Sequence, residues 1–381
     1  ISLGLGLGTS SNISRAIGAG NDHLVRRLAT DSLLLAFFLV AFVAILGLST
    51  MDPLFRFLGA RGEVLVHVKS YMRIWYISSA VLVIPIVGNN AIRATGDTDT
   101  PGLIMILAAL SNFILDPIFI FGFASIPPLG IVGAAIATVI SRTCAFFAAL
   151  WVLAFRSKLL DFSLPKLSEL LYSWKRVLFV GIPAAATHLM GPLSRGVIIR
   201  IVASFGTAAV AGVGAACRVE MFSYTVPRAL GSTLLPFVGQ NWGAKRYDRV
   251  ERGWRCSNLF AALWAVLSLL AVALLGEQLA SLFSEDAAVT ETMVLYLYII
   301  FAGSTLLHAN MYSTLALNAI NKPISATLLS ALRLFGFMIP MALGGAFFLG
   351  LPGVFAGVAL ANTSSALVAI YCFSKKLEDV R

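Results

Sequence analysis

Charged residues are scarce in this chain of 381 residues, where Asp, Glu, Lys and Arg make up 12% and hydrophobic residues make up 59%. A water-soluble domain needs more polar surface than this composition offers. We therefore predict an all-α polytopic membrane protein embedded in the lipid bilayer. The net charge of +10 does not indicate nucleic-acid binding, because the basic residues lie mostly in short loops between apolar runs, which is a pattern of membrane topology.

Cysteine is rare as well, and the four cysteines are far apart, with no C-x-x-C motif: Cys144, Cys217, Cys256 and Cys372. We expect buried free thiols, and neither disulfides nor metal ligands. Catalytic signatures are also missing, since the apolar runs hold no Ser/His/Asp set, no H-E-x-x-H motif and no pair of carboxylates. These absences argue against an enzyme.

Ten long apolar runs fill most of the chain, each near or above the roughly 20 residues that a helix needs to cross the hydrocarbon. They cover residues 32–48, 72–92, 101–123, 129–155, 177–205, 208–238, 258–276, 293–317, 324–349 and 352–373. Residues 1–17 are predicted to be part of a further helix whose start lies upstream. We expect that sequence before Ile1, including a whole first helix, is missing, and that the fragment without it is inactive.

Basic residues predict the orientation. Most Lys and Arg fall in alternate loops, whereas the intervening loops hold only Arg56, Arg61 and Lys69. The side that is rich in Lys and Arg is predicted to be cytoplasmic. We therefore predict a multi-pass protein of the inner (plasma) membrane with its C-terminus in the cytoplasm. The segment 157–176 is the longest loop on that side and is predicted to link two lobes.

Short motifs recur at a nearly constant offset. Gly18-Ala19 is matched by Gly243-Ala244, Thr100-Pro101 by Lys322-Pro323, and Leu129-Gly130 by Leu349-Gly350. Each pair lies on one side of the predicted membrane, so the repeats are parallel, an arrangement found in transporters. We predict two six-helix bundles related by a pseudo-two-fold axis: an N-lobe at residues 1–156, the linker at 157–176, and a C-lobe at 177–381.

Asp116 is the only ionisable residue between Leu103 and Ala124. A charge at membrane depth is costly and usually faces a bundle interior or a water-filled path. Pro117 directly follows and predicts a kink beside the acid. Asn112 lies one turn earlier on the same helical face, where its amide can reach the carboxylate or a bound cation. Asp116 is therefore the first candidate for a functional site.

Several motifs resemble one known family. They are Gly8-Thr9-Ser10-Ser11, Arg93-Ala94-Thr95-Gly96-Asp97-Thr98, Asn112-x-x-x-Asp116-Pro117 and Val238-Gly239-Gln240-Asn241-x-Gly243-Ala244. Together they resemble the multidrug and toxic compound extrusion (MATE) transporters, over nearly the whole chain. The resemblance implies two six-helix lobes around a central cavity, and export of amphipathic, often cationic compounds by alternating access, driven by inward flow of sodium or protons.

Within that family the DinF-like branch is most similar. The resemblance implies that the coupling cation is bound in the N-lobe by Asn112 and Asp116 on one helix and by Ala134 and Thr138 on the next. The branch's first-helix acid has no counterpart in this chain. Apart from a possible sodium ion at Asp116, no metal and no other cofactor is expected.

The expected function is thus that of a cation-coupled antiporter, active as a monomer on small amphipathic substrates. A lipid-linked precursor flippase and a non-transporting membrane scaffold remain alternatives. Met190, Met221, Phe222 and Tyr224 are candidates for the substrate cavity, because methionine and aromatic side chains suit apolar cations. His188 is a further candidate for proton relay or substrate contact. The sequence assigns no role to Arg195 and Arg333.

Overall fold

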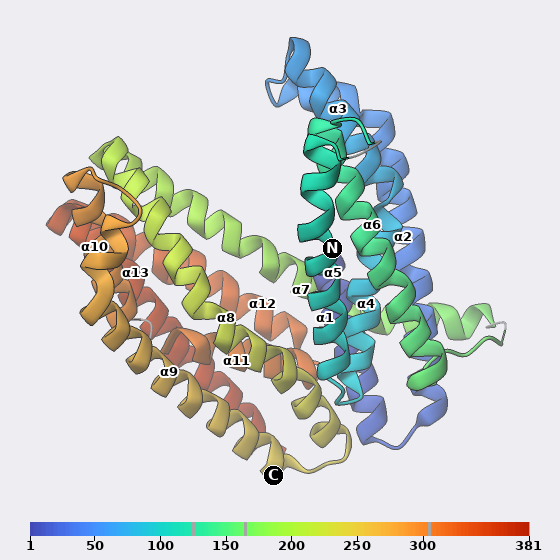
Figure 1. Ribbon diagram of the computed structural model, residues 1–381. Coiled ribbons are helices and arrows are strands. Elements are labelled where there is room, and N and C mark those ends of the chain that lie inside the picture. The colour runs from blue at the N-terminus through green and yellow to red at the C-terminus, as the bar shows by residue number, and fades with distance from the viewer. Residues whose placement is uncertain (124–125, 164–165, 304–305, 381) are drawn as a thin grey trace. The chain divides into compact units, whose positions relative to one another are not determined.

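The computed structural model describes residues 1–123, 126–163, 166–303 and 306–380, which form an all-α protein (Figure 1). The chain divides into two compact units. Residues 1–17 and 21–181 form unit 1, and residues 18–20 together with those from 182 onward form unit 2. Six of the described helices are long and apolar enough to cross a membrane, or up to eight if each of two bent helix pairs is one span.

The helices of unit 1 follow the predicted apolar runs. They are α1 (Ser2–Gly18), α2 (Asp22–Phe57), α3 (Gly62–Ile77), α4 (Ser79–Ala94), α5 (Asp99–Phe121) and α6 (Gly130–Trp151), which continues as the π-helical segment Val152–Arg156. Their shared core includes Ile13, Leu28, Ile92 and Leu153, all fully buried. The apolar runs fold as helices because a backbone in hydrocarbon must satisfy its own hydrogen bonds.

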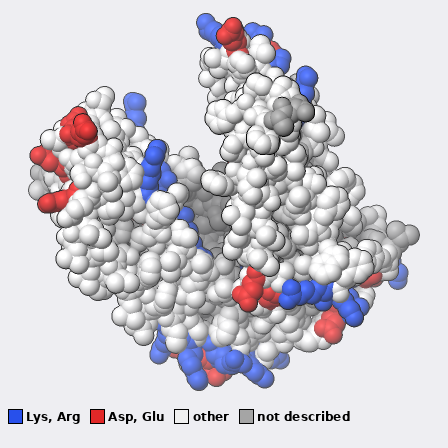
Figure 2. Space-filling view, viewed as in Figure 1, with Lys and Arg blue, Asp and Glu red and all other residues white. Residues whose placement is uncertain are grey.

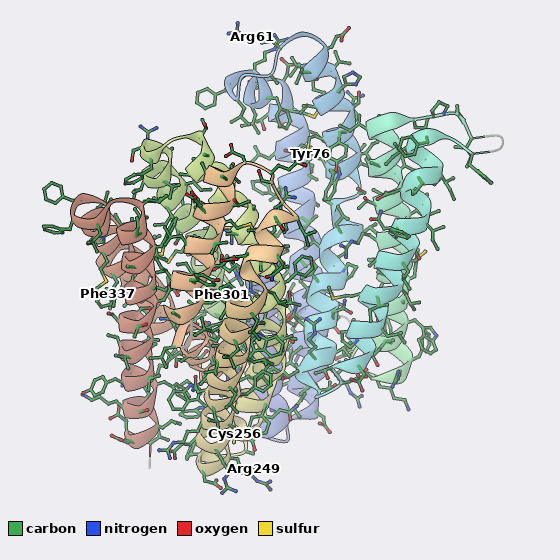
Figure 3. The ribbon with its side chains drawn as sticks, turned by 60° about the vertical axis from the view of Figure 1, so that its left-hand side comes forward. Arg61, Tyr76, Arg249, Cys256, Phe301 and Phe337 are labelled. Atoms are coloured by element: carbon green, nitrogen blue, oxygen red, sulfur yellow. The ribbon has the colours of Figure 1, made fainter. Side chains whose placement is uncertain are left out.

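The predicted run 72–92 is one span in the sequence but two helices in the structure. α3 and α4 meet at Ser78 with a bend of 48°, close to Tyr76 in Figure 3. The Ser78 hydroxyl donates to the Ile74 carbonyl at 2.6 Å, and the Ser79 hydroxyl donates to the Tyr76 carbonyl at 2.7 Å. Serine hydroxyls that bond back to the preceding turn compete with the helix ladder and bend it, which explains the break.

Unit 2 contains the remaining helices. They are the second part of α7 (Leu167–Val202), then α8 (Thr207–Gly243), α9 (Tyr247–Ser281), α10 (Ala287–Gly303), α11 (Leu307–Ala319), α12 (Pro323–Ala331), the π-helical segment Leu332–Met338 and α13 (Ile339–Glu378). Its core includes Val202, Met293, Leu297 and Phe355. α7 starts ten residues before the predicted run 177–205. Its first turns contain polar residues, so a search for apolar runs does not include them.

One glycine divides α13. Gly350 has φ 64 and ψ −143, which is not a helical conformation. Residues with a Cβ rarely adopt a positive φ, whereas glycine does so at little cost. The break falls between the predicted runs 324–349 and 352–373. The chain changes direction at Gly350, and the residues on both sides of it are helical. Pro352 follows at a position that suits the start of a helix.

The cysteines are free, as predicted, but not all are buried. Cys144 on α6 and Cys256 on α9 are exposed, and Cys217 and Cys372 are partly buried. The prediction of burial was wrong for the first two, because each lies on an exposed face of its helix, and a thiol is small enough to be tolerated there. Figure 3 shows Cys256 near the end of unit 2 that carries Arg249.

Candidate functional site

The candidate site begins on α5, where Asn112 and Asp116 lie one turn apart. The Asn112 side-chain amide donates to Oδ1 of Asp116 at 3.0 Å. Both residues are partly buried, and Pro117 lies inside the helix directly after the acid. The i to i+4 spacing that places both side chains on one helical face therefore produces the contact that the sequence predicted.

α6 supplies the second half of the site. Asn112 also donates to the Thr138 hydroxyl at 3.4 Å, and that hydroxyl in turn donates to the Ala134 carbonyl at 3.0 Å. The chain of hydrogen bonds thus runs from Ala134 through Thr138 and Asn112 to Asp116. All four residues that the resemblance indicated are brought together within unit 1.

Close packing between α5 and α6 makes this contact possible. A Cβ added at Gly133 would overlap the backbone at Phe119 and Ile120, so a glycine is required for the two helices to approach. The backbone amide of Leu129 donates to the Phe119 carbonyl at 3.1 Å and fixes the same end of the pair. Small residues at helix contacts serve this purpose in membranes, where close approach replaces the hydrophobic effect.

The site offers oxygen atoms and one ionisable group. The carboxylate of Asp116, the hydroxyl of Thr138 and the carbonyl of Ala134 are hard ligands of the kind that alkali and alkaline-earth cations prefer, and a carboxylate can instead take up a proton. Among the described residues, no group of three or more His, Cys, Asp or Glu side chains is placed to hold a metal ion. These oxygen atoms can bind and release a small cation or a proton.

The predicted cavity residues lie on α7 and α8 of unit 2 but differ in surroundings. Met190 packs against the core, His188 is exposed, and the Met221 and Phe222 side chains are largely exposed, with Phe222 at 76%. Tyr224 is buried, and its ring packs edge to face against the His308 ring with centroids 4.9 Å apart. Of these five side chains, only that of Tyr224 is buried.

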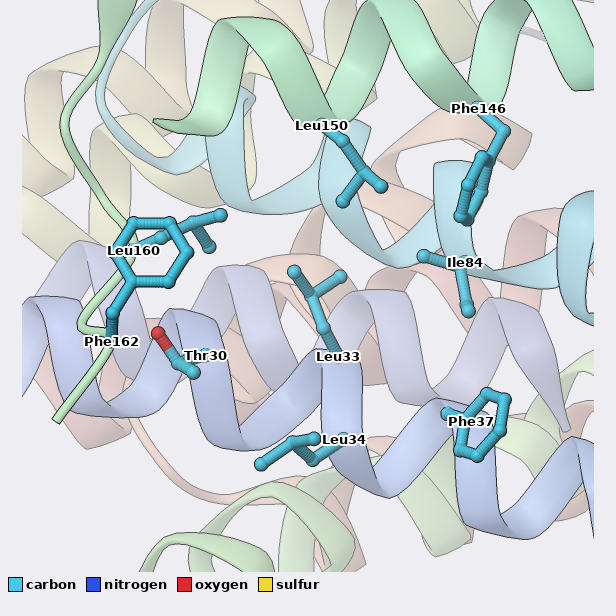
Figure 4. Close-up of a pocket in the computed structure, with 9 residues that line it drawn as sticks. All are labelled: Thr30, Leu33, Leu34, Phe37, Ile84, Phe146, Leu150, Leu160 and Phe162. Atoms are coloured by element: carbon cyan, nitrogen blue, oxygen red, sulfur yellow. The ribbon is translucent and has the colours of Figure 1, made fainter. Parts of the chain in front are cut away.

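A pocket of about 270 Å³ in unit 1 lies elsewhere (Figure 4). Its lining is apolar except for one threonine and comes from α2, α4, α6 and the linker: Thr30, Leu33, Leu34, Phe37, Ile84, Phe146, Leu150, Leu160 and Phe162. None of these residues belongs to the predicted cation site. The linker contributes Leu160 and Phe162, which close one end of the pocket.

Sequence reasoning missed a buried ion pair on α2. Arg27 forms a salt bridge with Asp31, and the two side chains are 4% and 0% exposed. Arg27 also lies 3.6 Å from the Asp161 carboxylate and donates to the Ser163 carbonyl at 3.2 Å, both in the linker. The indole of Trp174 donates to the Asp31 carbonyl at 2.9 Å. The i, i+4 spacing of Arg27 and Asp31 is the signal in the sequence that could have identified this pair.

The linker acid Asp161 lies outside the membrane-spanning segments. The hydroxyl of Ser163 donates to the Asp161 carboxylate at 2.7 Å and its backbone amide does so at 2.9 Å. These hydrogen bonds, together with the charge of Arg27, hold the pKa of Asp161 below its usual value. The Asp161 amide in turn donates to the Thr30 hydroxyl at 2.9 Å. Hydrogen bonds and an ion pair therefore connect the linker to α2.

The model of the MatE family matches residues 1–118 and 183–343 of this chain. The chain belongs to the MATE family of transporters. A MATE transporter is a multi-pass membrane protein and not an enzyme, which confirms the all-α membrane class and the transporter function predicted from the sequence.

Individual relatives agree with the family. The FAD transporter of Shewanella oneidensis is 34% identical over 381 residues, which are 100% of this chain and 84% of that protein. The multidrug export protein MepA of Staphylococcus aureus is 26% identical over 96% of this chain and 80% of that protein. The crystal structure of the Vibrio cholerae MATE transporter VcmN in the bent form has a TM-score of 0.94 at 31% identity, over 100% of this chain and 85% of that one.

Proposed function

We propose that this MATE transporter is a cation-coupled antiporter in which binding of sodium or a proton at Asp116, Asn112, Thr138 and Ala134 drives export of small amphipathic molecules. The observation that carries the proposal is the hydrogen-bond chain from Ala134 to Asp116, with bonds of 3.0, 3.4 and 3.0 Å, around the one acid in its apolar run. The Asp116 carboxylate is linked through Asn112 to two further oxygen atoms, the Thr138 hydroxyl and the Ala134 carbonyl, which are ligands that suit a cation.

Coupling in this scheme resides in unit 1. Binding of the cation neutralises Asp116 and changes the hydrogen bonds of Asn112 and Thr138, which link α5 to α6. Because Pro117 removes a ladder hydrogen bond next to the acid, a local change there alters the bend of α5 at low cost. In this scheme α5 has one bend when the cation is bound and another when it is released. Alternating access follows from the exchange between these two conformations. The arrangement proposed is that of the DinF-like branch, with two parallel six-helix bundles in the inner membrane and the C-terminus in the cytoplasm.

The cargo is proposed to be a small molecule with an aromatic ring. The relatives include a multidrug export protein and an FAD transporter. Their names do not point to cargo of one charge. Flat apolar rings are common among drugs and are present in flavins. Exposed methionine and aromatic side chains on α8 provide adaptable surface for such rings.

Replacement of the acid tests the coupling. Purified full-length protein in liposomes should export ethidium when an inward proton or sodium gradient is imposed, and Asp116→Asn should reduce the rate to that measured without a gradient. Asp99→Asn serves as the matched control, because Asp99 lies at the exposed start of the same helix. Imposing the two gradients separately identifies the ion.

Normal gradient-driven export by Asp116→Asn would contradict the coupling role. Absence of gradient-driven export of any dye by the wild type would instead favour a membrane scaffold.

A further inference from the structure

The apolar pocket of unit 1 lies where its helices enter the predicted hydrocarbon layer (Figure 4). Its α2 side chains fall at the start of the predicted span 32–48, and its α4 and α6 side chains fall in the second halves of the predicted spans 72–92 and 129–155. Figure 2 shows a broad band of unit 1 without charged side chains, between charged groups at its two ends. The pocket therefore lies within the predicted hydrocarbon layer, close to its cytoplasmic edge.

Water does not suit this pocket. A buried water molecule makes about two to four hydrogen bonds to polar partners. Among the lining residues that the structure describes, Thr30 alone has a polar side chain, and its hydroxyl already accepts the Asp161 amide at 2.9 Å. The volume of about 270 Å³ has room for several water molecules, but these side chains offer too few partners for even one.

Exposed aromatic side chains form the mouth of the pocket. Phe37 on α2 and Phe162 on the linker both line it, and they are 47% and 82% exposed. Two exposed aromatic residues that do not line the pocket, Phe38 on α2 and Trp151 on α6, continue the apolar surface on the same helices. Apolar surface at this depth faces lipid tails. Hydrocarbon is therefore the medium that reaches the mouth of the pocket.

The linker turns this pocket into a site that joins two kinds of segment. Leu160 and Phe162 lie outside the predicted spans, but their side chains form part of the lining beside Thr30 (Figure 4). Asp161 lies between them, and its hydrogen bond to Thr30 places the linker across α2. Leu160 also packs against the core of unit 1. An occupant of the pocket thus contacts α2, α4, α6 and the linker at the same time.

We propose that the pocket binds one acyl chain of a bilayer phospholipid, and that the bound chain holds the linker against α2. Contact with the chain removes apolar surface of Leu160 and Phe162 from water, which stabilises the docked linker. Lys158 is exposed and lies two residues before Leu160, so it offers a positive charge to the phosphate of the same lipid. The inference does not depend on the proposed antiport.

Native mass spectrometry of the purified full-length protein tests the binding. Titration of delipidated protein with phosphatidylglycerol should show one lipid bound more tightly than the others. Leu34→Trp places an indole in the pocket and should weaken this first binding step by about tenfold or more, because the ring occupies the volume of the chain. Leu46→Trp is the matched control, since Leu46 is on the same helix, is 50% exposed and does not line the pocket.

Two further variants change the linker without disturbing the core. Phe162→Ser replaces a side chain that is 82% exposed and should weaken the tight lipid by about tenfold through loss of apolar contact. Phe57→Ser is its control, because Phe57 is 87% exposed at the opposite end of α2. Lys158→Gln should reduce the preference for phosphatidylglycerol over phosphatidylcholine by about fivefold.

Amide hydrogen exchange tests whether the chain holds the linker. Phosphatidylglycerol added to delipidated protein should slow exchange of the Asp161 amide by about tenfold, because its hydrogen bond to Thr30 then opens less often. In Leu34→Trp the exchange rate should not depend on lipid. Equal lipid binding by wild type, Leu34→Trp and Phe162→Ser would overturn the proposal. Displacement of the tight lipid by ethidium would assign the pocket to cargo and would also overturn it.

Discussion

Single residues show where sequence reasoning succeeds and where it stops. The pairing of Asn112 with Asp116 follows from helical spacing alone, and the structure contains it at 3.0 Å. Thr138 lies on another helix, so its place beside Asn112 could be predicted only from the family resemblance. Likewise the Tyr296 hydrogen bond to Glu220 joins residues on α10 and α8, and no local pattern in the sequence connects them.

The buried ion pair on α2 leads to a prediction at this scale. Arg27→Ala removes the partner of a carboxylate that is 0% exposed, and leaving one buried charge alone costs about 3–5 kcal/mol. We expect a loss of that order in the free energy of unfolding, measured by titration with SDS. Arg26→Ala is the matched control, because Arg26 is the exposed neighbour.

The paired replacement Arg27→Leu with Asp31→Leu should recover most of that loss, since two apolar side chains need no partner. A single variant as stable as the wild type would show that water or another group compensates Asp31.

At the scale of elements, apolar runs predicted the helices well and their irregularities poorly. Hydropathy reports which residues face lipid, so α5 begins and ends within two residues of its predicted run. The break at Ser78 and the π-helical segments depend on side-chain hydrogen bonds and on packing with neighbours. Those interactions depend on which residues are close together in three dimensions, and hydropathy along the sequence does not contain this information.

The contact between α5 and α6 can be tested through its glycine. Gly133→Val would force its side chain into the backbone at Phe119, and overpacking typically costs about 1–3 kcal/mol. We expect lower thermal stability and slower gradient-driven ethidium export, because the Asn112 contact with Thr138 is lost. Gly102→Ala on α5 is the control, since nothing lies within 4 Å of a Cβ there; an equal effect of both replacements would contradict this role of Gly133.

The linker gives a prediction on pH. The pKa of Asp161 is held below its usual value by Ser163 and Arg27, so its ionised form stabilises the folded state. That contribution is complete above the unfolded value of about 3.9 and disappears as pH falls through the lower folded value. The stability difference between wild type and Asp161→Asn should be constant above about pH 5 and shrink below it. A difference that does not change down to pH 2 would exclude this role.

At the scale of the whole molecule, the charged residues of the predicted spans differ between the two units. The proposed cation site lies in unit 1 around Asp116, and the predicted spans of unit 2 hold several arginines and one carboxylate, that of Glu220. Composition predicted the membrane class because so few residues are charged, and motifs predicted the family. The sequence did not predict the ring contact between Tyr224 and His308, because α8 and α11 are distant along the chain.

The free cysteines have a practical consequence. Cys144 lies on α6 in unit 1 and Cys256 lies on α9 in unit 2, and both thiols are exposed. The natural chain thus carries one accessible attachment point for a spin label or fluorophore in each unit. After replacement of the partly buried Cys217 and Cys372 by serine, labels can be attached to the two remaining thiols. The distance between these labels can then be measured during a transport cycle.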